Sequence, residues 1–179
     1  YANLSIISTN VYEIMNLQQK VTPSIETVIF DVLSYKGEIY ERTDDVEFDI
    51  EDASIAISEE YIKKVISELI DNAFKYSDKG VKIKIDCKKG YDESINTEGI
   101  VEINIIDGGR GMAEEQISNI DAYMQFDRKV YEQQGSGLGL SIVQRIIDLH
   151  NGFFKIESEP DKFTKVTVKM PLSNKMKDL

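Results

Sequence analysis

The sequence predicts an α+β fold, a two-layer α/β sandwich in which a mixed, mostly antiparallel sheet has helices packed on one face. Apolar residues recur at helical spacing over residues 22–35, 58–77 and 140–149. Apolar and polar residues alternate over residues 81–87 and 101–105, which is typical of half-buried strands. The order along the chain is helices, then strands, a glycine-rich segment, a helix and a hairpin. This order favours one sheet covered by one helical layer.

Two of the helices carry start signals. Thr22 and Pro23 fit an N-cap and a first-turn proline. Ser58 fits an N-cap for the second helix, with Glu59 and Glu60 in its first turn. The apolar stripe of this second helix is formed by Ile62, Val65, Ile66, Leu69, Ile70 and Ala73. It is expected to face the core.

The strands are expected to form two hairpins and one short strand. A polar loop over residues 88–99 would join the two alternating segments, and residues 154–170 would form a closing hairpin around Pro160-Asp161. A short strand is expected at residues 47–50. Residues 108–136 show little periodicity, and a structureless segment of that length in a compact domain is typical of a functional lid.

The bulk properties limit the class of protein. A chain of 179 residues is long enough for one domain with a substantial core. The net charge of −11 argues against a nucleic-acid partner. The single cysteine, Cys87, excludes an intrachain disulfide and a cysteine-based metal site, and it predicts an intracellular, cytoplasmic location. The chain begins without Met, so we expect a piece of a longer protein whose missing part could hold a membrane anchor.

Three polar residues follow one flank of the helix at residues 58–77. Glu68, Asn72 and Lys75 lie at i, i+4 and i+7, so a carboxylate, a carboxamide and an ammonium share one edge of the buried stripe. Taken alone, a solvated helix edge is an equally good interpretation.

Asp107 lies where a strand ends in the glycine-rich stretch IIDGGRGM. It shares a strand face with Ile103 and Ile105, so its carboxylate is expected to point toward the core, where it is costly without a partner. The amino group of a bound base would satisfy it, and Gly109 and Gly111 would let the backbone come close. The alternative is a tight turn with a capping aspartate.

A second glycine-rich stretch, QQGSGLGLSIV, places Gly135, Gly137 and Gly139 directly before a helix. Free backbone N–H groups at such a helix start form an anion site. The stretch is neither a Walker A loop nor a good dinucleotide-binding fingerprint. Arg128, in the intervening YMQFDRK, could pair with a terminal phosphate or form a surface salt bridge.

In this order and spacing, the four stretches resemble the boxes of the ATP-binding catalytic domain of sensor histidine kinases, a branch of the GHKL ATPase superfamily. ELIDNAFKYS resembles the N box, IIDGGRGM the first glycine box, YMQFDR the F box and GSGLGLSIVQRIIDLHNG the second glycine box. The resemblance covers roughly residues 22–171. It implies a helix end or linker at residues 1–20, an ATP-binding catalytic domain at residues 21–174 and a C-terminal tail at residues 175–179.

The resemblance implies roles for residues of the N box and of the first glycine box. Asn72 would coordinate Mg2+ between the phosphates, with Glu68 as a second candidate at the metal, and Lys75 would contact the phosphates. Tyr76 would lie against the adenine or ribose, and Asp107 would accept a hydrogen bond from the adenine amino group. The further residues implied to bind the nucleotide are Gly109, Gly111, Met112, Arg128, Gly135, Ser136, Gly137, Leu138, Gly139 and Leu140.

The sequence departs from the family pattern at three points. Glu68 replaces a frequent asparagine, and it could assist proton removal or lie in the outer environment of the metal. Tyr123 replaces the usual phenylalanine of the F box. The single histidine, His150, lies at a helix C-terminus, where it is expected to cap carbonyls rather than accept phosphate. The phosphoacceptor is therefore expected to precede Tyr1.

The implied function is a histidine protein kinase that binds Mg-ATP and phosphorylates a histidine on a dimerisation domain absent from this chain. Its other partners would be ADP and a response-regulator receiver domain, with a homodimer for the full-length protein and a monomer for this chain. The alternatives are a GHKL-type ATP hydrolase in which Glu68 activates water, and a nucleotide-sensing module. A serine-directed anti-sigma kinase is disfavoured by the F box.

Overall fold

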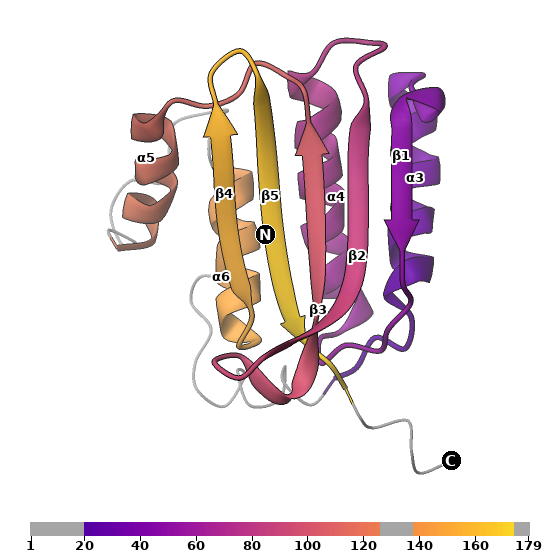
Figure 1. Ribbon diagram of the computed structural model, residues 1–179, viewed down its shortest axis with the longest axis vertical. Helices are drawn as coiled ribbons and strands as arrows, with labels where there is room; N and C mark the ends of the chain where they lie inside the picture. The colour runs from indigo at the N-terminus through magenta and orange to yellow at the C-terminus, as the bar shows by residue number, and fades with distance from the viewer. Residues whose placement is uncertain (1–19, 126–137, 174–179) are drawn as a thin grey trace.

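The computed structural model describes residues 20–125 and 138–173, with the backbone alone for residues 119, 121–125 and 138 (Figure 1). Its sheet has the strand order β1-β2-β3-β5-β4. The strands are β1 (Val46–Ile50), β2 (Ile83–Asp92), β3 (Asn96–Asp107), β4 (Phe153–Glu159) and β5 (Phe163–Pro171). β1 pairs with β2 in parallel, and the other neighbouring strands are antiparallel.

The helices α3 (Ile25–Tyr40), α4 (Glu59–Tyr76) and α6 (Leu138–Leu149) cover one face of this sheet (Figure 1). A short 3-10 turn, η1 (Thr43–Asp45), leads from α3 into β1. The remaining described helix, α5 (Glu114–Gln125), lies beside the β4 edge. The predicted α+β sandwich with a mixed, mostly antiparallel sheet is therefore confirmed.

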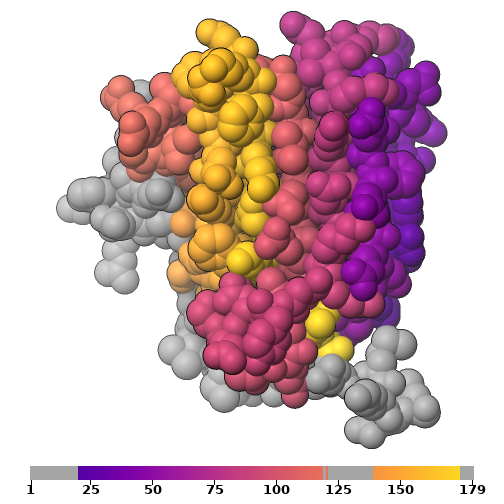
Figure 2. All heavy atoms as spheres, in the orientation of Figure 1, coloured from indigo at the N-terminus to yellow at the C-terminus, as the bar shows by residue number. Residues whose placement is uncertain are grey.

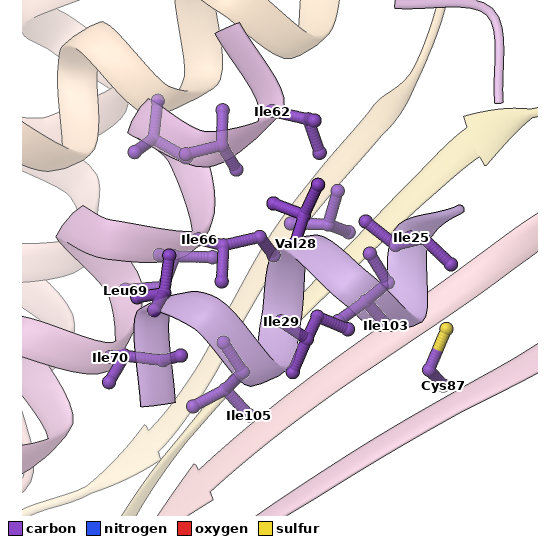
Figure 3. Close-up of a cluster of buried hydrophobic side chains, with 14 of the residues drawn as sticks. Ile25, Val28, Ile29, Ile62, Ile66, Leu69, Ile70, Cys87, Ile103 and Ile105 are labelled. Atoms are coloured by element: carbon purple, nitrogen blue, oxygen red, sulfur yellow. The ribbon is translucent and has the colours of Figure 1, made fainter. Parts of the chain in front are cut away.

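The core lies between the sheet and the helical layer. Figure 3 shows its centre, where Ile25, Val28 and Ile29 of α3 meet isoleucines of α4 and the inner face of β3. Cys87 on β2 is fully buried there, and burial raises the pKa of its thiol to about 12. It is a small core residue, as the sequence predicts.

The opposite face of the sheet is polar. Figure 2 shows this face, which none of the described helices covers. Its charged side chains pair across neighbouring strands, as in Lys88–Asp49 at 2.6 Å and Lys169–Glu102 at 3.8 Å. This arrangement explains the alternation in the sequence, because one side of each strand faces the core and the other faces water.

The first start signal is placed wrongly by the sequence. α3 begins at Ile25, and Ser24 caps it by accepting a hydrogen bond from the backbone N–H of Thr27 at 3.1 Å. Thr22 instead pairs with Ile55 in an isolated antiparallel bridge and donates its hydroxyl to the carbonyl of Ile57 at 2.7 Å. Ser58 is the N-cap residue of α4 as expected, but its hydroxyl makes no capping hydrogen bond.

Two expected irregular segments are partly regular. The polar loop expected at residues 88–99 is mostly strand, because β2 extends to Asp92 and β3 starts at Asn96. Beyond the core both faces of this hairpin are exposed, so the alternation fades although the pairing continues. The lid segment expected at residues 108–136 contains α5, whose weak apolar stripe the sequence analysis missed.

Candidate functional site

A cavity of about 280 Å³ lies between α4, α5, α6 and the strands β3 and β5. Its apolar wall includes Leu69, Ile105 and Val166, and its polar groups come from the predicted motifs. The predicted site residues that line it are Asn72, Tyr76, Asp107, Gly111, Met112, Gly139 and Leu140. An apolar cavity with a few convergent polar groups is the usual form of a small-molecule site.

The last two turns of α4 form one wall of the cavity. Leu69, Asn72, Ala73 and Tyr76 lie at i, i+3, i+4 and i+7, so the helix period brings them to one side. The side chain of Asn72 is half-buried, and no other residue in the described ranges shares a hydrogen bond with its carboxamide. That carboxamide is therefore available to a ligand.

Asp107 forms the floor of the cavity at the end of β3. Its side chain is 6% exposed and accepts a hydrogen bond from the backbone N–H of Gly109 at 2.9 Å. Burial raises the pKa of this carboxyl to about 6, although the Gly109 bond and the positive charge of Arg42 act in the opposite direction. The predicted inward orientation of Asp107 is confirmed by its burial in line with Ile103 and Ile105.

Gly109 and Gly111 are required by the chain itself. A Cβ on Gly109 would lie 2.2 Å from the carbonyl oxygen of Tyr76, and one on Gly111 would lie 2.1 Å from that of Glu159. Gly111 also has a φ of 63°, in the left-handed region. The first glycine stretch thus fits tightly between the end of α4 and the β4–β5 turn, a reason for glycine that differs from approach to a bound base.

Arg110 lies between these glycines and covers Tyr76. Its guanidinium carbon is 4.1 Å from the centroid of the Tyr76 ring, and its backbone N–H donates to the Tyr76 carbonyl at 3.0 Å. Lys75 also approaches this ring, with Nζ 5.2 Å from the centroid. Arg110 lines both the cavity and a neighbouring open depression, whereas Lys75 lines only the depression.

Glu68 lies one turn before Asn72 on α4 and faces the start of α6. One of its carboxylate oxygens accepts a hydrogen bond from Lys64 at 2.5 Å, and the other would lie 2.7 Å from a Cβ on Gly139. Glu68, Asn72 and Lys75 therefore do not share one pocket in the described structure. They point to the α6 start, the cavity and the open depression respectively.

The sequence analysis missed several residues of the cavity, among them Arg110, Thr164, Gln116 and Ile120. Thr164 faces Asp107 because these two residues are partners in the β3–β5 register. That register cannot be read from the sequence. Arg110 stands inside a recognised motif, so its position between two functional glycines was an available signal.

The remaining predicted residues cannot be placed. Arg128, Gly135, Ser136 and Gly137 lie outside the described residues, and only the backbone is described for Leu138. Among the described residues, no group of three or more His, Cys, Asp or Glu side chains could hold a metal ion.

His150 is buried at the end of α6, with 2% of its surface exposed. Its Nδ1 lies 2.7 Å from the carbonyl oxygen of Ile146, and its ring is 5.7 Å from the ring of Tyr61. Burial lowers the pKa of the imidazole. The predicted carbonyl-capping contact is thus present, and a buried ring is poorly placed to accept phosphate.

Comparisons with known proteins agree with this site. Residues 57–174 match the family described as "Histidine kinase-, DNA gyrase B-, and HSP90-like ATPase". The chain belongs to this family, and within it to the histidine-kinase type of ATP-binding catalytic domain in the GHKL superfamily.

Two relatives are sensor histidine kinases of Bacillus subtilis (strain 168). YvrG is 26% identical over 158 residues, which are 85% of this chain and 26% of the relative. YkoH is 30% identical over 138 residues, which are 76% of this chain and 28% of the relative. The chain thus spans about a quarter of the length of these relatives.

Solved structures share the fold. The mycobacterial sensor histidine kinase MprB matches with a TM-score of 0.66 and 20% identity, over 86% of this chain and 97% of that one. The Acinetobacter baumannii histidine kinase AdeS matches with a TM-score of 0.67 and 23% identity, over 97% of this chain and 77% of that one.

Across residues 20–125 and 138–173, no helix is both long and apolar enough to cross a membrane.

Proposed function

We propose that this chain binds Mg-ATP in the cavity between α4, β3 and α6 and transfers the γ-phosphate to a histidine on a dimerisation domain outside this chain. It would then be the catalytic domain of a two-component histidine protein kinase whose phosphate passes to a response-regulator receiver domain. The observation that carries the proposal is that a single cavity is lined by residues from the N box and from both glycine boxes.

The adenine fits the apolar part of the cavity. Asp107 would accept a hydrogen bond from the exocyclic amino group, which would give this buried carboxylate a second donor besides Gly109. Leu69, Ile105 and Val166 supply apolar surface for the faces of the base. Tyr76 would lie along the adenine or ribose, with its ring orientation held by Arg110.

The residues near α4 fit a magnesium ion that is bound largely through phosphates. Mg2+ prefers oxygen ligands, keeps several waters and uses only one or two protein groups at nucleotide sites. The Asn72 carboxamide would supply one such oxygen, and Glu68, already paired with Lys64, would lie in the outer environment of the ion. When bound, the ion would neutralise charge on the phosphates.

The phosphates would lie toward the start of α6. Gly139 and Leu140 line the cavity in the first turn of that helix, where free N–H groups favour anions. Lys75 is exposed and lines the neighbouring depression, so its contact with the phosphates would require another rotamer. We also propose contacts with the phosphates for Arg128, Gly135 and Gly137, from their positions in the motifs.

Transfer would break the bond between the γ-phosphorus and its bridging oxygen and form a bond to an imidazole nitrogen, with ADP as the leaving group. The proton of the acceptor imidazole must also leave. Little covalent chemistry falls to this chain, whose contribution would be positioning and charge neutralisation. In the full-length protein, a homodimer would bring the acceptor to the cavity.

Calorimetry on this chain tests nucleotide binding. We expect heat of binding with Mg-ATP and Mg-ADP for the wild type and a large loss of it for Asp107→Asn. No heat with either nucleotide would refute the proposal. Transfer is tested with γ-labelled ATP on this chain and on a longer one that includes the upstream helices. Acid-labile label should appear only on the longer chain, and label on the short chain would contradict the assignment of the acceptor.

A GHKL-type hydrolase is the second candidate, favoured by the position of Glu68 against Gly139. In hydrolysis Glu68 would take a proton from water. Comparison of ATP turnover by Glu68→Ala, Glu68→Gln and the wild type decides this point. An unchanged turnover would remove the hydrolase, and binding without turnover or transfer in the longer chain would leave a nucleotide-sensing module.

A further inference from the structure

We propose that Arg42 is a positioning residue for the nucleotide site: its guanidinium fastens the C-terminal end of α4, and so holds Asn72 and Tyr76 in register with the strand end that carries Asp107. Arg42 lies in the connection between α3 and β1 and does not line the cavity. The inference rests on the proposed function, because it concerns the same cavity.

The end of α4 needs an external cap. Its C-cap residue, Ser77, is extended, with φ −118° and ψ 151°, so the helix does not close in the left-handed conformation that usually satisfies its last carbonyls. Two of those carbonyls have other partners. The Ser77 hydroxyl donates to Ala73 at 2.6 Å, and the backbone N–H of Arg110 donates to Tyr76 at 3.0 Å.

Arg42 supplies further hydrogen bonds to this end of the helix. Its Nη1 donates to the carbonyl oxygens of Phe74 at 2.9 Å and of Ser77 at 2.8 Å, and it also lies 3.1 Å from the Ser77 hydroxyl. Its Nη2 donates to the carbonyl of Val81 at 3.0 Å, across the turn that leads to β2. One side chain therefore joins the last turn of α4 to the segment that follows it.

The guanidinium itself is fixed in place. Its Nε donates to Asp45 at 2.6 Å, and the same carboxylate oxygen accepts the N–H of Gly80 at 2.9 Å. The guanidinium carbon lies 5.4 Å from the centroid of the Phe74 ring, and Arg42 is only 5% exposed. A planar fork of five N–H donors is needed to reach these acceptors, and the ammonium of lysine could not do so.

These contacts act on both sides of the cavity. Asn72, Ala73 and Tyr76, which line it, lie within the turn that Arg42 caps or directly before it. The positive charge of Arg42 also lowers the pKa of Asp107, against the larger effect of burial. Among the described residues that line the cavity, the charged group besides Asp107 is Arg110, which is stacked on Tyr76.

Two substitutions separate the geometry of Arg42 from its charge. Arg42→Met removes both the fork and the charge, whereas Arg42→Lys keeps the charge. Lys36→Met is the matched control, because Lys36 of α3 is also bonded to α4, through Asp71 at 2.6 Å, but does not touch the end of the helix. Thermal unfolding of each variant identifies the temperatures at which all are folded.

Affinity for Mg-ADP is then measured by calorimetry at those temperatures. We expect Arg42→Met to weaken binding about tenfold or more, Arg42→Lys to weaken it less, and Lys36→Met to leave it within about twofold of the wild type. A wild type that fails to bind would refute the proposed function. A wild type that binds, with all three variants within twofold of it, would refute only the inference.

A second readout distinguishes positioning from general stability. Adenosine carries no phosphate, so the pH dependence of its binding, followed by NMR, reports Asp107. We expect the midpoint to move to higher pH in Arg42→Met and to stay near the wild-type value in Arg42→Lys and Lys36→Met, because only the first loses the positive charge that lowers the pKa of Asp107. Equal midpoints in all four proteins would overturn the role of the charge. If Arg42→Met does not fold, the test is the affinity of Arg42→Lys for Mg-ADP, which we expect to be lower than that of Lys36→Met. Equal affinities of these two variants would then refute the inference.

Discussion

Two buried charges flank the C-terminal end of α4, and they differ in how fully the chain satisfies them. Arg42 is 5% exposed and donates to Asp45, Phe74, Ser77 and Val81. Asp107 is 6% exposed, and in the described structure its carboxylate accepts one hydrogen bond, from Gly109. Buried charges are usually paired or fully hydrogen-bonded. The fully hydrogen-bonded charge of Arg42 therefore stabilises the fold, and the under-satisfied charge of Asp107 is the one that a ligand could still satisfy.

The largest effect on stability is expected from the satisfied charge. Arg42→Met should lower the free energy of unfolding by about 3 kcal/mol, because it removes the guanidinium donor from buried carbonyls and leaves the Asp45 carboxylate without its charged partner. Urea denaturation of the wild type and the variant measures the difference. If Arg42→Met lowers the free energy of unfolding no more than Lys36→Met does, Arg42 has no special role in stabilising the fold.

The under-satisfied charge should behave in the opposite way. Asp107→Asn is expected to raise the free energy of unfolding at pH 7 by about 1–3 kcal/mol, because it removes a carboxylate that burial destabilises, while it weakens nucleotide binding. Urea denaturation of the wild type and Asp107→Asn shows whether the substitution raises or lowers the free energy of unfolding. A destabilised Asn variant would mean that the carboxylate is already satisfied without a ligand.

The pH dependence follows from the raised pKa of Asp107. Its folded-state value of about 6 lies above the ordinary value of 3.8, so its stabilising contribution is present below pH 4 and is lost as the pH rises through 6. The advantage of Asp107→Asn at pH 7 should therefore shrink as the pH falls from 6 to 4. Urea denaturation at pH 7, 5 and 4 checks this, and a constant difference would contradict it.

The smallest effect is expected on the uncovered face of the sheet. The Lys88–Asp49 pair has the same 2.6 Å separation as Arg42–Asp45, but its side chains are 49% and 69% exposed. Lys88→Met should change the Tm by less than about 2 °C, because water already solvates both ions. A larger drop in Tm would show that the distance between the two charges, and not their burial, controls how much such a pair stabilises the protein.

The sequence was sufficient for the fold class and for most of the cavity. Four motifs in one order identified the ATP-binding resemblance, and the helical stripe of α4 and the alternation of β2 and β3 located the core. These signals are strong because one face of each element is buried and the other is solvated.

Other features depend on pairing between distant segments. The partner of Asp107 across β3 and β5 is Thr164, and the cap of α4 is Arg42, more than 30 residues before it. Neither relation follows from local periodicity. Lys75 was expected beside Asn72 from helical spacing alone, and spacing did not reveal that it faces a separate depression.

The β4–β5 turn has a consequence for where the chain can be lengthened. The carbonyl of Arg110 accepts the N–H of Asp161 at 2.7 Å, and the hydroxyl of Ser158 accepts the N–H of Met112 at 2.8 Å. The turn at the other end of the sheet, between Asp92 and Asn96, makes no such contact with the described residues of the cavity lining. A reporter peptide inserted at residues 93–95 should leave ATP recognition intact, whereas one inserted at residues 160–162 would pull apart the loop that follows β3.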